Sequence, residues 1–287
     1  MVFAQSLLSG VLIGGVYALI GIGLTLVFGV MRVINFAHGD LLMLGMYLAF
    51  FAFQLLHVDP FLSILIVIPV MFAFGMLLQR AFIQRVLDAL PQNQILLTIG
   101  LGLILSNSMM LAFTSDYRIL TTTYSSSSLR LAGISISEPL LLSFLVTAVI
   151  TLLLYSFLLR TNMGQAIRAT AQDSEAAQLM GIDVRRMGLV AMGMGAALAG
   201  TAGALVAPTY YIYPQVGGAF TLKAFVIVVL GGMGSVVGAT LGGIVIGAVE
   251  SLAAVYVSSG LKELFVYLLF LVVLLVKPSG LLGKSRM

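Results

Sequence analysis

Long apolar runs recur from one end of this 287-residue chain to the other, and they constrain its fold more than any other feature. A helix that spans a bilayer needs roughly 20 predominantly apolar residues, and several segments reach that length with few or no charges. Only helices and closed barrels satisfy every backbone hydrogen bond in lipid. Because continuous apolar runs lack the alternation of barrel strands, the sequence predicts an all-α, polytopic transmembrane helical bundle, in a single domain over residues 1–287.

The predicted spans are spread along the whole chain. They lie at about residues 6–30, 39–56, 60–79, 94–113, 139–159, 188–207 and 261–276, with a glycine-broken region at 222–257. That region holds either one split or re-entrant span or two short crossings, so we expect eight or nine crossings in total. With 61% hydrophobic and only 8% charged residues, the chain is not a soluble domain, and it offers no basic face to a nucleic acid.

Basic residues set the expected orientation, because cytoplasmic loops carry an excess of Lys and Arg. They follow the third and fifth spans and form the C-terminal tail: Arg80 and Arg85; Arg160, Arg168, Arg185 and Arg186; Lys277, Lys284 and Arg286. We therefore expect a cytoplasmic C-terminus, an external N-terminus and a Ser- and Thr-rich outer loop at 114–138. The largest cytoplasmic loop is then about residues 160–188.

This cytoplasmic loop contains the stretch DSEAAQLMGIDVRR at 173–186, with five charged side chains in fourteen positions. Asp173 is a good N-cap for a short helix, and Glu175 lies in its first turn, where the helix dipole favours an anion. Gly181 is placed to end the helix as a left-handed C-cap. The apolar residues of the helix are expected to face the cytoplasm: Ala176, Ala177, Leu179 and Met180. Such a patch is either a docking surface or packs under the bundle.

A second polar cluster separates the first two apolar runs. Four polar residues fall within nine positions: Arg32, Asn35, His38 and Asp40. One interpretation is an ordinary cytoplasmic turn, with Asn35 or Asp40 capping the next helix. The other is a broken helix whose freed backbone groups line the solute path. The residues of that path are then Asn35, Phe36, His38, Gly39 and Asp40. Thr98, in the fourth span, either contacts solute or hydrogen-bonds to a neighbouring helix.

Glycines are concentrated in the region at 222–257. The predicted helix-packing or gate residues are Gly231, Gly232, Gly234, Gly238 and Gly242. The last three repeat every four residues on one helical face, a spacing that lets helix backbones approach closely, whereas Gly-Gly-Met-Gly at 231–234 predicts a helix break. A phosphate-binding loop is excluded, because the stretch lies in a membrane segment and has no Walker lysine.

Ionisable residues give no support for catalysis. The two histidines, His38 and His57, have no clustered carboxylate or cysteine with which to hold a metal, and the chain contains no cysteine. Glu250 lies in an apolar segment, where a carboxylate should be paired or protonated. Lys223 and Lys262 are expected at the membrane boundary.

Three stretches, in the same order along nearly the whole chain, resemble ABC importer permeases. Glu175-Ala176-Ala177, followed after three residues by Gly181, resembles the EAA loop of that superfamily. TLVFGVMRVINFAHGDLLMLGMY at 25–47 is similar to the opening signature of the LivH-type branched-chain amino-acid permeases. VIVVLGGMGSVVGATLGGIVIGAVE at 226–250 is similar to the second signature of that family.

The resemblance implies the permease subunit of an ATP-driven importer in a bacterial or archaeal inner membrane, which carries branched-chain amino acids. The implied partners are a LivM-like second permease, two cytoplasmic ATPase subunits that bind ATP and Mg, and an external substrate-binding protein. This chain would then be neither an enzyme nor a carrier of a cofactor or metal. The implied ATPase-coupling residues are Asp173, Glu175, Ala176, Ala177, Leu179 and Gly181.

Two alternatives to this function stay open. The family also includes permeases for urea, amides and other small organic solutes. A secondary transporter or channel would be favoured if Glu250 or the region around His38 formed a proton or ion path.

Overall fold

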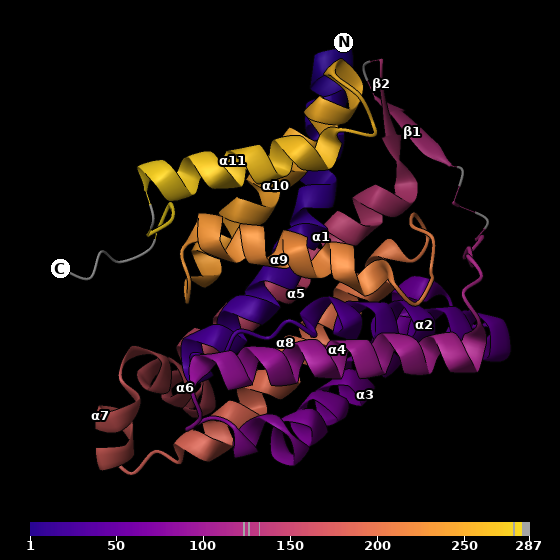
Figure 1. Ribbon diagram of the computed structural model, residues 1–287. Coiled ribbons are helices and arrows are strands. Elements are labelled where there is room, and N and C mark those ends of the chain that lie inside the picture. Colours follow the sequence, from indigo (N-terminus) through magenta and orange to yellow (C-terminus); the bar gives the residue numbers. More distant parts are fainter. Residues whose placement is uncertain (123, 126, 132, 278, 283–287) are drawn as a thin grey trace.

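The computed structural model describes residues 1–122, 124–125, 127–131, 133–277 and 279–282 (Figure 1). Lys284 and Arg286 of the predicted basic tail lie outside these residues. The all-α prediction is confirmed, because the described residues form eleven α-helices and a single two-stranded hairpin.

The helices follow one another with short connections. They are α1 (Val2–Met31), α2 (His38–Leu56), α3 (Pro60–Ala81), α4 (Pro91–Phe113), α5 (Glu138–Arg160), α6 (Asn162–Gln172), α7 (Ser174–Leu179), α8 (Val184–Val206), α9 (Val216–Gly231), α10 (Val236–Tyr256) and α11 (Lys262–Val276), with a 3₁₀ turn η1 (Ile83–Arg85). Of the described helices, seven are long and apolar enough to cross a membrane: α1 to α5, α8 and α10. α9 is apolar but shorter, and α11 has 15 residues. The chain is thus a multi-pass membrane protein, and its eight or nine crossings remain a prediction.

Two helix boundaries differ from prediction for identifiable reasons. α8 begins at Val184, earlier than expected, because the Asp183 side chain accepts a hydrogen bond from the Arg186 backbone N–H at 3.0 Å and caps the helix. The broken region at 222–257 consists of two helices, α9 and α10, which are joined by a turn with positive φ at Gly232 and Gly234. Four helices therefore lie between the loop at 160–188 and Lys277: α8, α9, α10 and α11.

The segment at 114–138, predicted as an outer loop, contains the hairpin of β1 (Ser128–Leu131) and β2 (Ile134–Ser137). Two contacts tie this segment to other loops. Arg118 pairs with Ile212 through backbone hydrogen bonds, and the Tyr124 hydroxyl donates to Asp59 Oδ2 at 2.7 Å. Burial of Tyr124 and its hydrogen bond to Asp59 raise the pKa of the phenol. The loops at this end of the bundle are therefore connected to one another by hydrogen bonds.

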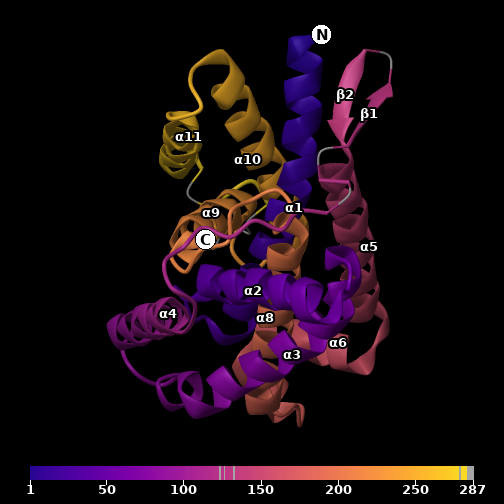
Figure 2. The ribbon, with the colours of Figure 1, turned by 90° about the vertical axis from the view of Figure 1, so that its right-hand side faces the viewer.

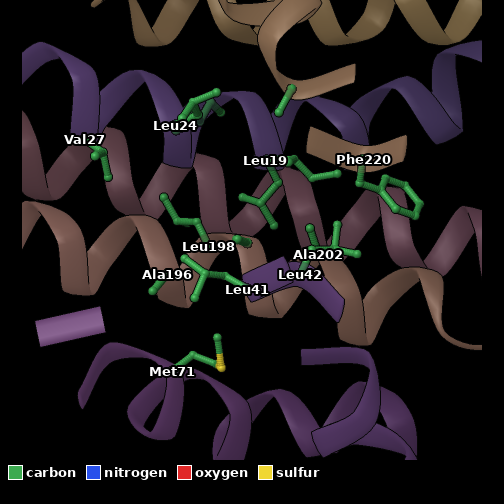
Figure 3. Close-up of a cluster of buried hydrophobic side chains, with 14 of the residues drawn as sticks. Leu19, Leu24, Val27, Leu41, Leu42, Met71, Ala196, Leu198, Ala202 and Phe220 are labelled. Atoms are coloured by element: carbon green, nitrogen blue, oxygen red, sulfur yellow. The ribbon is translucent and has the colours of Figure 1, made fainter. Parts of the chain in front are cut away.

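α1 and α8 form the centre of the bundle. Both are largely buried, whereas α4 and α5 expose most of their surface. α1 is flanked by α5 on one side and α10 on the other (Figure 2). Side chains of α1, α2 and α8 meet in the core, among them Leu19, Leu41 and Leu198 (Figure 3). The outer helices thus surround a tightly packed centre.

Glycines allow the central helices to touch through their backbones. A Cβ added to Gly45 of α2 would overlap the backbone of Gly200 in α8, and one added to Gly203 would overlap the carbonyl oxygen of Leu42. Gly243 of α10 lies equally close to the backbone of α1 at Ala18. Small residues at such crossings increase van der Waals contact where lipid provides no hydrophobic driving force.

Replacing Gly45 with Ala should destabilise the protein, because the added methyl group would push α2 away from α8. Overpacking costs about 1–3 kcal/mol, so the melting temperature of the purified protein in detergent should fall by roughly 5 °C. The matched control is Gly100→Ala in α4, where no atom lies within 4 Å of the new Cβ. Equal losses in the two variants would contradict the backbone contact.

Candidate functional site

The chain between α1 and α2 turns back into the bundle. α1 ends at Arg32, which adopts a left-handed conformation with φ 57°. The first residue of α2, His38, places its Nε2 atom 3.0 Å from the carbonyl oxygen of Ile20, in the middle of α1. The Thr98 hydroxyl, inside α4, donates to the carbonyl oxygen of Ile34 at 3.1 Å. α2 therefore begins beside the interior of two spans and not at the end of the bundle.

This connecting segment is buried and internally hydrogen-bonded. Asn35 is 1% exposed and His38 is fully buried. Asn35 Oδ1 accepts a hydrogen bond from the Ala37 backbone N–H at 3.0 Å, and the Gly39 N–H donates to Thr221 Oγ1 of α9 at 3.0 Å. These contacts satisfy backbone groups that a continuous helix would have paired. The segment is therefore packed into the bundle, and its role in a solute path stays a prediction.

The predicted path residues fall into two groups. Phe36 and Asp40 line a groove of about 300 Å³ between α2, α4 and α9. The other four do not line this groove and instead hold the segment against neighbouring helices: Asn35, His38, Gly39 and Thr98. The groove also includes polar residues that the sequence analysis missed: Ser106, Gln215 and Thr221. They belong to no recognisable motif, and only the fold brings them together.

A buried charge cluster joins α9, α10 and α11. Glu250 Oε1 lies 2.9 Å from Lys223 Nζ and 2.9 Å from Lys262 Nζ, so the expected pairing of Glu250 is present. Lys223 also donates to the Tyr17 hydroxyl at 3.3 Å. Lys223 is only 4% exposed within the protein, and its position at the membrane boundary stays a prediction. Glu250 makes this burial possible by compensating the charge of the ammonium group.

α7 projects from the bundle at the end opposite to the N-terminus (Figure 1). Asp173 Oδ1 accepts hydrogen bonds from the backbone N–H groups of Glu175 and Ala176, both at 3.0 Å. Gly181, with φ +84°, follows the helix in the left-handed conformation. Both caps therefore lie where the sequence analysis placed them.

Two large apolar side chains at the C-terminal end of α7 are uncovered in this chain. Leu179 is 88% exposed and Met180, at its C-cap, is 83% exposed, while Glu175 and Ala176 are also exposed. Ala177 was predicted to face the cytoplasm and does not, since it is 4% exposed and packs toward the bundle. A cleft of about 660 Å³ lies beside the helix, between the turn at 84–88 and the connection from α7 to α8.

The predicted packing or gate glycines lie at the corner between α9 and α10. The backbones of Gly231 and Gly238 touch, and Gly242 packs against the carbonyl oxygen of Ile227. Gly232 and Gly234 form the turn, and Ser235 caps α10 by accepting from the Gly238 N–H at 3.0 Å. Gly234 therefore does not share a helical face with the two later glycines, and their close contacts are made within this chain.

The fold and these sites define a multi-pass helical membrane protein with a capped, exposed loop helix and a buried, hydrogen-bonded connection between its first two helices. Comparison with known families adds that residues 6–274 match the family described as "Branched-chain amino acid transport system / permease component". The chain belongs to this family of permeases.

Individual relatives match over almost the full chain. The high-affinity branched-chain amino acid transport system permease protein BraD of Pseudomonas aeruginosa is 34% identical over 99% of this chain and 97% of its own length. LivH of Escherichia coli K12, with the same description, is 32% identical over 99% of this chain and 96% of its own. LivM of that organism is 33% identical over 50% of this chain and 33% of its own length. No solved structure gave a significant match.

Replacing Thr98 with Val should destabilise the protein, because the carbonyl oxygen of Ile34 would lose its hydroxyl donor in a buried segment. Such interhelical hydrogen bonds contribute about 1 kcal/mol in membrane proteins. Thr240→Val is the control, since the Thr240 hydroxyl bonds only to the carbonyl of Val236 in its own helix. We expect a lower melting temperature for Thr98→Val alone; the same result for both variants would argue against the interhelical bond.

Replacing Glu250 with Gln should lower stability strongly, since the buried Lys223 would lose its close partner at 2.9 Å and keep only Glu263, which is about half exposed and 3.9 Å away. Removal of one member of a buried ion pair costs about 3–5 kcal/mol. The double variant Lys223→Met/Glu250→Gln should be more stable than Glu250→Gln, because it removes the uncompensated charge. Thermal unfolding of the wild type, both single variants and the double variant in detergent measures this coupling, and strictly additive losses would contradict the pairing.

Proposed function

We propose that this chain is the permease subunit of an ATP-driven importer and forms the path for branched-chain amino acids across a bacterial or archaeal inner membrane. The names of BraD and LivH, which refer to high-affinity branched-chain amino acid transport, support Leu, Ile and Val as solutes. In this proposal the chain binds solute only transiently, and an external substrate-binding protein delivers it and provides most of the affinity.

The importer would contain two permeases and two cytoplasmic ATPase subunits. A LivM-like second permease is supported by the similarity of this chain to LivM, since related subunits can pair around a shared path. ATP and Mg would bind to the ATPase subunits. This chain would then act as a transport subunit and not as the enzyme.

The observation that carries the proposal is the exposed apolar surface of α7. Leu179 and Met180 extend into solvent from a short helix that Asp173 and Gly181 cap at its two ends. A capped helix keeps its shape without the partner, and burial of a Leu or Met side chain contributes about 1.5–3 kcal/mol to binding. This geometry suits a helix that docks on an ATPase subunit and transmits its movement to α6 and α8.

The orientation follows from the same argument. With α7 at the ATPase side, the loop at 160–188 and the tail at Lys277 are cytoplasmic, and the N-terminus is external. ATP-driven closure would move α7, and the bundle would rock between outward-open and inward-open states around the groove.

The charge cluster disfavours a secondary transporter. Glu250, the acidic group considered for an ion path, is compensated by Lys223 and Lys262. A proton path would require this carboxylate to exchange protons readily, which two close ammonium groups oppose. Permeases for urea, amides or other small solutes stay the alternative within the family.

Replacing both Leu179 and Met180 with Ser should weaken the binding of the ATPase subunits at least tenfold, because the contact would lose two apolar side chains. Leucine-stimulated ATP hydrolysis in proteoliposomes should fall as the binding of the ATPase subunits weakens. Gln165→Ser, at an exposed position of α6 in the same loop, is the control and should change neither. Unchanged assembly and hydrolysis in the double variant would contradict the assignment of α7 as the coupling helix.

A further inference from the structure

The groove between α2, α4 and α9 contains a single ionisable group. Its walls include Phe36, Leu103 and Leu222, which are apolar, and Ser106 and Gln215, which are polar. Asp40 is the only charged side chain among the described residues that line it. A space of about 300 Å³ with apolar walls and a few convergent polar groups is typical of a small-molecule site.

Among the described residues, no cation pairs with the Asp40 carboxylate. It lies between Gly102 of α4 and Gly217 of α9, where a Cβ on either glycine would approach one of its oxygens to 2.6 Å. Asp40 is 8% exposed, and none of the ion pairs formed by the described residues includes it.

An acidic group in this position differs from the other buried carboxylate of the protein. Glu250 has two lysines within 2.9 Å, whereas Asp40 faces the groove without a compensating charge. Ionisable groups at membrane depth are costly and pair with protein groups or with what passes along a pathway. Since no cation among the described residues compensates Asp40, we expect a ligand that carries a positive charge.

We propose that Asp40 receives the ammonium group of an aliphatic α-amino acid in this groove during its passage. This inference rests on the proposed function and identifies the feature of the solute that the permease itself recognises. Phe36, Leu103 and Leu222 contact the aliphatic side chain, and Ser106 and Gln215 offer donors to the α-carboxylate. Uncharged amides and urea lack the ammonium group, so Asp40 favours amino acids over them.

The test uses the absence of cysteine from the chain. Ser106→Cys is introduced into the assembled complex, and its thiol is modified with a cationic or an anionic methanethiosulfonate reagent. The cationic reagent should react on the order of a hundredfold faster than the anionic one, because a unit charge about 10 Å away at an effective dielectric constant of about 20 speeds the first and slows the second by roughly tenfold each. When Asp40→Asn is added to the Ser106→Cys variant, the cationic and anionic reagents should react at nearly equal rates. Ile104→Cys, an exposed position two residues away on another face of α4, should show no such dependence on Asp40.

Leucine uptake into proteoliposomes provides the second measurement. With the complete complex, Asp40→Asn should raise the KM for leucine or lower kcat at least tenfold, and Asp40→Glu should restore part of the loss. If the wild type accumulates leucine but Asp40→Asn changes neither uptake nor the ratio of rates, the inference is wrong and the proposed function stands. A Ser106→Cys thiol that reacts in the isolated permease but not in the complex would also overturn it, because the groove would then be an interface.

The two claims can fail separately. If the wild-type complex does not accumulate leucine with ATP, the proposed function fails. The ratio of reagent rates still reports in that case whether Asp40 makes the groove select for cations, and a ratio near one in the presence of Asp40 would overturn the inference by itself.

Discussion

The arrangement of this protein depends on one constraint: backbone groups freed by a helix break inside a membrane protein must find partners in the protein. The segment between α1 and α2 satisfies this requirement with side chains from two other helices, Thr98 of α4 and Thr221 of α9, and with Asn35. His38 reaches the carbonyl of Ile20, and Thr98 reaches that of Ile34. These bonds fix where α2 begins and thereby place Asp40 at the groove. The polar cluster at 32–40 therefore partly builds the site and partly lines it.

Close glycine contacts and the buried charge cluster make the rest of the bundle a firm frame. α2 and α8 meet through Gly45 and Gly203, and α9 and α10 meet through Gly231 and Gly238. The ion pair of Lys223 with Glu250 holds α9 against α10 farther along. Helices packed this tightly move as units, which suits a subunit that rocks as a body when α7 is displaced by a partner.

The sequence was most informative where a structural rule is local. Hydropathy predicted the long spans, and Asp173 and Gly181 predicted both ends of α7, because caps act within a single turn. The sequence did not reveal contacts between residues that lie far apart along the chain. α4 and α9 meet at the groove only through tertiary packing, and nothing in the apolar segment around Lys223 indicated that Glu250 would compensate its charge. Val216 starts α9 despite the two glycines that follow, since contact with α2 outweighs their low helix propensity.

The central claim is that this permease moves solute only when separate ATPase subunits drive it through α7. The most direct measurement is accumulation of radiolabelled leucine in proteoliposomes that contain the binding protein and both permeases, with and without the ATPase subunits and ATP. We expect leucine to accumulate against a gradient only when the ATPase subunits and ATP are both present. Accumulation without the ATPase subunits would contradict it and would assign this chain to the secondary transporters.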